Sequence, residues 1–236
     1  MEHTPFTLHH EEDATGLVSL VYADIRRRMT FVPAIFKALA GDPRMLEQAW
    51  LQARALCDDP AFAESTGRLR VVAAPVVASA SSRALRRAVA PFAAELPGML
   101  LIVSSLAAAL DGRLPRRPPQ GVIEPADAPP EPDVPELRGE HSLYPSIRAS
   151  YGTTHVPSLY RSLAALDLLE EAWGIAGPLL SSDAGQALVD RVSTAGDVEA
   201  MRFGDVGYFG VEEARPILDQ FCVALPRNLV VALALS

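Results

Sequence analysis

Histidine is the side chain best suited to proton transfer near neutral pH, and His155 has the most informative surroundings of the five in this chain. It stands immediately before a Val-Pro pair, where its imidazole can bind a carboxylate or act as a base. A histidine that is satisfied by its neighbours, or exposed in a loop, is the alternative, and the sequence leaves both open. The run His9-His10-Glu11-Glu12 has metal-capable atoms but lacks the HExxH spacing of a helical zinc site. We therefore do not expect a metal site in this run.

The other reactive side chains do not form a known catalytic motif. The sequence contains no P-loop, no GxGxxG and no GxSxG. Lys37 is the only lysine and aligns with Arg161 in the repeat described below, which favours a structural role over that of a Schiff-base nucleophile. Cys57 and Cys222 form no CxxC, zinc or disulfide framework, which is typical of a reducing compartment. Any chemistry must therefore come from groups that the fold brings together.

The segment that positions His155 occurs twice in the chain. Residues 153–173 read TTHVPSLYRSLAALDLLEEAW, and residues 30–50 read TFVPAIFKALAGDPRMLEQAW. Both contain Val-Pro, an aromatic residue, a basic residue, Leu-Ala and an acidic segment that ends in Ala-Trp, and the only two tryptophans close the two copies. In this alignment His155 takes the place of Phe31. The sequence therefore predicts two copies of one helical unit, with any ligand site where the copies meet.

Composition and periodicity predict an all-α fold. Apolar residues make up 49% of the 236 residues and aromatic residues 6%, an Ala- and Leu-rich balance that favours packed helices. Apolar residues also recur at helical spacing from Val18 to Met29. Eight prolines fall in residues 111–140, which predicts an extended connector. We expect two pseudosymmetric helical repeats joined by this Pro-rich linker, in the following order: a flexible arm (1–14), a first repeat (15–110), the linker (111–140) and a second repeat (141–236).

Prolines also predict where helices break. Pro75 is expected to mark a kink or a boundary. The pair Ser81-Ser82 can cap a helix that runs towards Leu96, and Pro97-Gly98 is expected to interrupt it. The apolar run from Met99 to Leu110 is then predicted to be a separate buried helix, because twelve residues are too few to span a bilayer.

Charge and the N-terminal residues narrow the classes of function. The net charge of −8 argues against a nucleic-acid partner, because an acidic surface repels phosphate. The first residues, MEHTPFTLHHEEDATG, carry acids and histidines where a signal peptide needs positive charge and then an apolar core. We expect a soluble, cytoplasmic protein with a small-molecule ligand and with no nucleic-acid or membrane partner. A homodimer, and recognition of a partner by the linker, stay open.

Several segments together resemble a known family. EEDATG, VYADIR and FVPAIFKALAGDP with a following LEQAW in the first half, and THVPSLYRSLA and ALPRNLVVALAL in the second, resemble the group I (DL) 2-haloacid dehalogenases. The resemblance covers roughly residues 10–110 and 140–236. It implies an all-helical fold of two pseudosymmetric repeats, an active site between them and no metal or organic cofactor. It also implies hydrolytic removal of halide from a small 2-halocarboxylate, by a water molecule that attacks the carbon directly.

The resemblance also implies positions for the groups that handle this water. It places the water-activating aspartate between Ser158 and Tyr160, where this chain has Leu159, and a water-holding asparagine at Leu96. Leucine neither accepts a proton nor orients water, so we expect the family's own reaction to be impaired. We expect a divergent member that acts on or binds a small organic acid or a biosynthetic intermediate. A non-catalytic binding or assembly protein on the same scaffold is the alternative.

The predicted site has two groups of residues. We expect His155 and Tyr160 to act on the ligand, and we expect four further residues to contact it: Ser158, Leu159, Leu96 and Asp24. Asp24 is included because its helix lies near where the copies are expected to meet, and a solvated helix face is the alternative. Leu159 also fits a core stripe, and Ser158 and Tyr160 also fit a turn and a packed ring.

Overall fold

Helices account for the regular structure in the computed structural model, which describes residues 5–74, 81–115, 118, 120–125, 134–204 and 212–236. No strand occurs in these described ranges, so the predicted all-α class is confirmed. Pro75 and parts of the linker, namely 116–117, 119 and 126–133, lie outside the described residues.

Both halves of the chain contribute helices in the same order. The first half forms α1 (Gly16–Arg26), α2 (Ala34–Leu39), α3 (Pro43–Cys57), α4 (Ala61–Ala73) and α5 (Arg83–Leu110). The second half forms α6 (Tyr144–Tyr151), α7 (Ser158–Ala165), α8 (Leu169–Ser181), α9 (Asp183–Ala200) and α10 (Arg215–Leu235). Three short 3-10 helices add to these: η1 (Glu11–Asp13), η2 (Met201–Phe203) and η3 (Glu212–Ala214). A repeat requires this order, and the repeat itself stays a prediction.

Side-chain caps fix several of the helix starts. Asp42 accepts hydrogen bonds from the backbone N–H of Arg44 (2.9 Å) and Met45 (3.3 Å), and the first residue of α3 is Pro43. Ser82 accepts a hydrogen bond from the N–H of Leu85 (3.1 Å) and so caps α5, as predicted. The local sequence thus decides where these two helices begin.

The predicted break at Pro97-Gly98 is wrong. α5 continues through Pro97 to Leu110 as one helix of 28 residues. A proline inside a helix costs about 3 kcal/mol because it removes a hydrogen bond and clashes with the preceding turn. Every residue from Leu96 to Leu110 is buried, and this burial offsets the cost. α10 likewise continues through a proline, Pro226, which is also buried.

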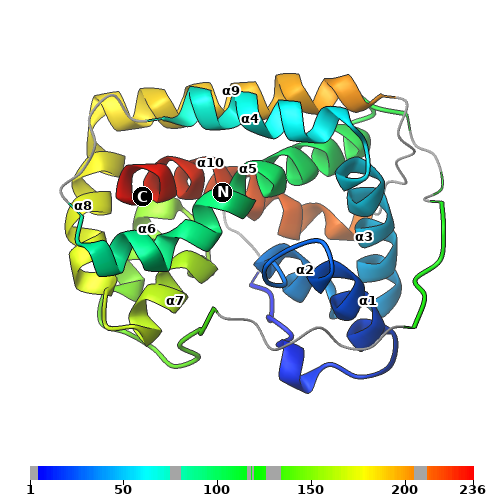
Figure 1. Cartoon of the computed structure of the whole chain (residues 1–236), viewed down its shortest axis with the longest axis horizontal. Helices are drawn as coiled ribbons and strands as arrows, with labels where there is room; N and C mark the ends of the chain where they lie inside the picture. The colour runs from blue at the N-terminus through cyan, green and yellow to red at the C-terminus, as the bar shows by residue number, and fades with distance from the viewer. Residues whose placement is uncertain (1–4, 75–80, 116–117, 119, 126–133, 205–211) are drawn as a thin grey trace.

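The two longest helices form the centre of the molecule. α5 and α10 pack against each other, and α4 and α9 lie side by side along one face of this pair (Figure 1). The remaining helices lie on the other face, with α1 to α3 at one end and α6 to α8 at the other (Figure 1). α2 contacts α10 and α7 contacts α5, so each half places its short helix against the long helix of the other half.

Burial explains the hydropathy of the two central helices. Arg83–Leu110 and Glu212–Leu235 are long and apolar enough to cross a membrane by composition alone. However, 83% and 67% of their most apolar windows are buried inside the protein. Such burial is typical of the core helices of a soluble protein, because the apolar faces already have partners.

The N-terminal arm and the linker, which contain no long helix, pass along the junction of the two halves. The expected loose arm contacts the rest of the protein over residues 5–14: the N–H of His9 donates to the carbonyl of Lys37 (3.0 Å), and Tyr22 donates to the carbonyl of His9 (2.8 Å). The linker passes α7, where the N–H of Leu137 donates to the carbonyl of Arg161 (3.0 Å). The arm and the linker therefore connect the two halves, and the predicted domain boundaries stay predictions.

Candidate functional site

A cavity of about 40 Å³ lies where α2, α5, α7 and α10 meet. One water molecule needs roughly 10–15 Å³ by this measure, so the space holds about three waters or a small organic molecule. Its wall consists of Phe31, Pro33, Ala34, Ile35, Phe92, Glu95, Leu96, Met99, His155, Pro157, Ser158, Leu159, Phe221, Leu225 and Asn228. We call this space the inner cavity. Both halves contribute to it, at positions that correspond in the predicted repeat.

Helix periodicity places these side chains. On α5, Phe92, Leu96 and Met99 follow the i, i+4, i+7 spacing of one helix face. Phe221, Leu225 and Asn228 repeat that spacing on α10. The residues around each Val-Pro pair complete the wall, because proline ends the extended segment and the short helix starts immediately after it. The wall is therefore built from matched elements of the two halves.

The two sides of the inner cavity differ in polarity. The first half contributes Phe31, Ala34 and Met99, which are all apolar. At the corresponding positions the second half contributes His155, Ser158 and Asn228, which are all polar. At these three pairs of positions the inner cavity thus has an apolar wall from the first half and a polar wall from the second. The first half also contributes the carboxylate of Glu95, and the second half also contributes apolar residues, namely Pro157, Leu159, Phe221 and Leu225.

Two groups of the polar wall are buried without a hydrogen-bond partner. Ser158 is 8% exposed and Asn228 is 6% exposed, and neither the Ser158 hydroxyl nor Oδ1 of Asn228 has a partner among the described residues. Leaving such a group unsatisfied costs about 1–3 kcal/mol. Both the hydroxyl and the amide can donate to an acid, since the amide can turn to present either its oxygen or its nitrogen. These groups are therefore suited to hold a polar ligand atom.

His155 borders the polar wall and packs between rings. Its imidazole lies 4.8 Å from the ring of Phe221 and 5.0 Å from the ring of Phe6, between ring centroids. Phe6 comes from the N-terminal arm and also stacks on Phe221 at 5.7 Å. The arm therefore packs directly behind a residue of the inner cavity, a contact that the sequence did not predict.

Both leucines of the predicted site line the inner cavity. Leu159 is 2% exposed and Leu96 is 6% exposed, and both belong to the wall. Neither side chain can accept a proton or hold a water molecule by a hydrogen bond. At these two positions the inner cavity is therefore apolar.

Glu95 is a carboxylate in the wall that sequence reasoning missed. Its Oε1 accepts hydrogen bonds from the backbone N–H (3.0 Å) and the hydroxyl (2.8 Å) of Thr30. In the second half, Oε1 of Gln220 accepts the same pair of hydrogen bonds from Thr154, at 3.1 and 2.8 Å. Glu95 therefore fastens the segment before Phe31 to α5, and a neutral amide does the same in the other half.

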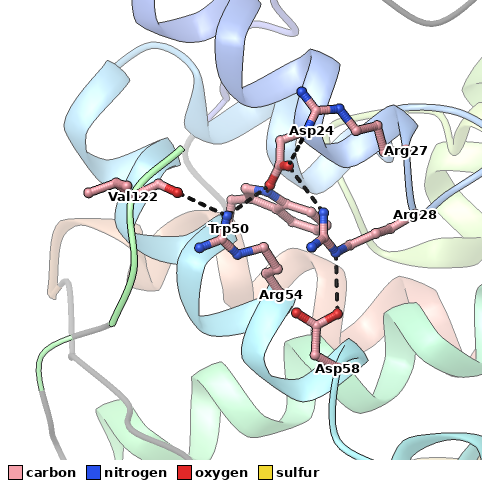
Figure 2. Close-up of polar contacts among 7 residues, drawn as sticks. All are labelled: Asp24, Arg27, Arg28, Trp50, Arg54, Asp58 and Val122. Atoms are coloured by element: carbon pink, nitrogen blue, oxygen red, sulfur yellow. Dashed lines mark hydrogen bonds and ion pairs between the residues drawn. The ribbon is translucent and has the colours of Figure 1, made fainter. Parts of the chain in front are cut away.

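Asp24 lies outside the inner cavity, in a buried polar cluster between α1 and α3. It is 3% exposed and accepts hydrogen bonds from Nε1 of Trp50 (2.7 Å), Arg28 (3.1 Å) and Arg54 (3.2 Å). Figure 2 shows these side chains converging on the carboxylate, with Arg54 also donating to the carbonyl of Val122 in the linker (3.2 Å). The structure thus gives Asp24 structural partners and does not bring it together with the other predicted site residues.

The charge state of Asp24 follows from these partners. Burial by itself raises the pKa of a carboxyl group, but the hydrogen bond from Trp50 and the charges of Arg28 and Arg54 outweigh it and lower the pKa of Asp24. Asp24 is therefore ionised at neutral pH and is held as an anion by its neighbours.

Tyr160 also points away from the inner cavity. It is fully buried, its hydroxyl lies 2.9 Å from the hydroxyl of Tyr151, and its ring packs edge-on against Trp173. Burial raises the pKa of Tyr160, so the phenol is neutral and unsuited to act as a base. Of the six predicted site residues, the structure brings His155, Ser158, Leu159 and Leu96 together and places Tyr160 and Asp24 elsewhere.

Metal-binding side chains do not gather near the inner cavity. Across the described part of the chain, no group of three or more His, Cys, Asp or Glu residues is arranged to hold a metal ion. The inner cavity offers the polar groups of His155, Ser158 and Asn228 from the second half, and hydrocarbon together with the carboxylate of Glu95 from the first.

The fold is shared with D-2-haloacid dehalogenases. A mutant of such an enzyme in complex with D-2-CPA matches with a TM-score of 0.72 and 18% identity over 98% of this chain and 93% of that one. A D-2-haloacid dehalogenase in complex with L-LA matches with a TM-score of 0.72 and 16% identity over 100% of this chain and 96% of that one. No family model and no curated protein matches the sequence. At these identities the likeness shows the fold alone, a haloacid dehalogenase-like scaffold.

Proposed function

We propose that this dehalogenase-like protein binds a small organic acid in the inner cavity and does not hydrolyse 2-haloacids by the family's route. One observation carries the proposal: the Ser158 hydroxyl and Oδ1 of Asn228 are buried without a hydrogen-bond partner among the described residues, opposite the apolar residues Phe31, Ala34 and Met99. An acid with a short carbon chain matches this division. Its carboxylate satisfies the polar groups, and its carbon atoms replace water against hydrocarbon.

The wall determines how such an acid lies. The Ser158 hydroxyl and the Asn228 amide donate to the carboxylate, and His155 borders the same side. The carbon chain then lies against residues of the first half, such as Phe31 and Met99. Because the donors all come from the second half, the acid has one preferred orientation across the junction.

Leu159 is the reason to expect binding without the family's hydrolysis. Direct attack by water on carbon needs a base that takes a proton from that water. The position that the resemblance assigns to this base holds a leucine that is 2% exposed in the wall of the inner cavity. The proposal therefore separates recognition of the acid from its chemical conversion.

Calorimetric titration with 2-chloropropionate and with lactate tests the proposed binding. We expect saturable binding to the wild type and about tenfold weaker binding to Ser158→Ala, because a hydrogen bond to a charged group contributes about 1.5 kcal/mol or more. Tyr160→Phe is the matched control and should bind as the wild type does, because Tyr160 lies outside the wall. Equal affinities of wild type and Ser158→Ala would contradict the proposal, as would the absence of binding.

Glu95 favours a second candidate function, that of a hydrolase with a different base. Its carboxylate belongs to the wall and is next in sequence to Leu96. Against this role, its Oε1 already accepts two hydrogen bonds from Thr30. The variant Glu95→Gln separates the two functions, since the amide oxygen preserves both hydrogen bonds but cannot take a proton. Turnover by the wild type that disappears in this variant would establish Glu95 as the base.

A further inference from the structure

A second pocket lies on the outer side of His155. It has a volume of about 260 Å³ and is bounded by the arm, by α6 and by the segment that leads into α7. Its wall consists of Phe6, Leu8, His10, Glu140, Tyr144, Arg148, Thr154, His155, Val156 and Arg161. We call it the outer pocket. Among the described residues, His155 alone belongs to the walls of both the inner cavity and the outer pocket, so this imidazole separates the two.

The hydroxyl of Tyr144 is a buried polar group in the wall of the outer pocket. The residue is 1% exposed, it lines the outer pocket, and its hydroxyl has no hydrogen-bond partner within the described ranges. Burial raises the pKa of Tyr144; the charge of Arg161 opposes this rise, and those of Glu140 and Glu136 add to it. The phenol is therefore protonated at neutral pH and can donate a hydrogen bond into the pocket.

Arg161 supplies a cation beside this donor. Its Nε is buried and has no hydrogen-bond partner among the described residues, and it lies 3.9 Å from Oε2 of Glu136. Glu136 is shared with Lys37, whose Nζ lies 3.3 Å from the other carboxylate oxygen. A single carboxylate thus faces two cations, and the contact of Arg161 with it is an ion pair too long for a hydrogen bond.

The rest of the outer pocket contains three apolar residues, an ion pair at its edge, and the polar residues His10 and Thr154. Phe6, Leu8 and Val156 provide hydrocarbon surface. Glu140 is the acid of this wall, and it is largely exposed and pairs with Arg148 at 3.5 Å. The pocket therefore combines the Tyr144 hydroxyl, which has no partner among the described residues, and the cation of Arg161 with three apolar side chains, in a lining that is otherwise mostly polar.

We infer that the outer pocket binds a monocarboxylate with an apolar body. A guanidinium and a phenol can both donate to one carboxylate, and charge-assisted hydrogen bonds of this kind are stronger than neutral ones. The hydrophobic part of the ligand lies against Phe6, Leu8 and Val156. The assignment is independent of the function proposed for the inner cavity, because it depends on other residues and on a larger space.

Benzoate is the probe that separates the two sites. Its ring is too large for a cavity of about 40 Å³ but fits one of about 260 Å³. We expect NMR-monitored titration of the full chain to show saturable benzoate binding. Tyr144→Phe should weaken it about tenfold, because it removes one hydrogen bond to a charged group and leaves the ring in place. Ser158→Ala is the matched control and should leave benzoate affinity unchanged.

A stability control and the binding results together test whether the outer pocket binds the carboxylate. Thermal unfolding of Tyr144→Phe should match the wild type within a few degrees, so that weaker binding reports the lost hydroxyl and not a damaged fold. Unchanged benzoate affinity in Tyr144→Phe would mean that water alone satisfies the phenol, and it would overturn the inference. Failure of the folded wild type to bind benzoate at tens of millimolar would overturn it too, and so would a loss of binding in Ser158→Ala.

Discussion

The two halves of the chain make opposite contributions to the inner cavity. Phe31, Ala34 and Met99 of the first half are apolar, and the second-half residues that align with them in the predicted repeat, His155, Ser158 and Asn228, are polar. The same backbone arrangement therefore accepts either polar or apolar side chains at these positions. Packing sets the shape of the inner cavity. The three polar side chains on one side determine which way a polar ligand would face.

Buried polar groups elsewhere in the first half have a different role. Asp24 is buried like Ser158 and Asn228, but it accepts hydrogen bonds from Trp50, Arg28 and Arg54 (Figure 2). A polar group with its partners in place contributes to stability, whereas one without partners reduces it. The contrast predicts that changes at Asp24 affect folding and that changes in the polar wall affect binding.

The largest expected effect is the loss of the Asp24 carboxylate. Asp24→Asn should lower the free energy of unfolding by about 3 kcal/mol, because removing one partner of a buried ion pair leaves the other charges uncompensated. Urea unfolding at neutral pH measures this, and acid binding to the folded variant should equal that of the wild type. Weakened binding in a variant of normal stability would place Asp24 in the site after all.

The same variant tests the charge state of Asp24 through pH. The folded-state pKa of Asp24 is lowered, so its contribution to stability is complete above the unfolded pKa of about 3.9 and is lost as the pH falls through the folded value. The stability difference between wild type and Asp24→Asn should therefore shrink below about pH 4. A difference that is constant from pH 7 to pH 3 would show that the charge of Asp24 has no part in it.

The next largest effect is expected when the residues of the polar wall are replaced by those of the apolar wall. Ser158→Ala combined with Asn228→Met installs the first-half residues at both positions. Affinity for 2-chloropropionate should fall at least about 100-fold, about tenfold for each lost hydrogen bond to the carboxylate. The free energy of unfolding should rise by about 1–3 kcal/mol, because two unpaired buried groups are removed. A loss of stability instead would show that these groups have partners in the folded protein.

The reverse exchange should act on stability more than on binding. Ala34→Ser combined with Met99→Asn gives the first half the residues of the second, and it should destabilise the fold by about 2 kcal/mol because the apolar wall gains unsatisfied polar groups. Acid affinity should change only a few-fold, since the donors of the polar wall remain. Urea unfolding and calorimetry on one preparation give both values, and a large gain in stability would contradict the contrast between the walls.

The smallest effect is expected at Tyr160. Tyr160→Phe leaves the Tyr151 hydroxyl without its partner and should cost about 1 kcal/mol of unfolding free energy. Affinity for the acid should not change, because Tyr160 packs between Tyr151 and Trp173. A tenfold change in affinity would return Tyr160 to the site.

Sequence alone predicted the all-α class and the residues next to the two Val-Pro pairs. His155 was chosen because it replaces Phe31 before the Val-Pro pair, and Ser158 and Leu159 because the resemblance places the family's aspartate there. All three line the inner cavity, and their role in a site stays a prediction. Tyr160 was assigned to the wrong surroundings, since neighbouring residues of a helix point about 100° apart and Leu159 already faces the inner cavity.

Other features depend on long-range packing. Glu95 and Asn228 were missed because α5 and α10 are buried on most of their faces, so hydropathy does not show which side faces the inner cavity. Pro97 was read as a break because the sequence shows the local cost of proline but not the burial that offsets it. The partners of Asp24 come from α3 as well as α1, and only the folded arrangement identifies them.

Halide release from 2-chloropropionate by the wild type tests the central claim most directly, at a concentration where calorimetry shows the site to be filled. The claim is that the inner cavity holds the acid but lacks the base at Leu159, so halide should accumulate no faster than in the absence of protein. Release at roughly 1 per second or faster, an ordinary enzymatic rate, would contradict it.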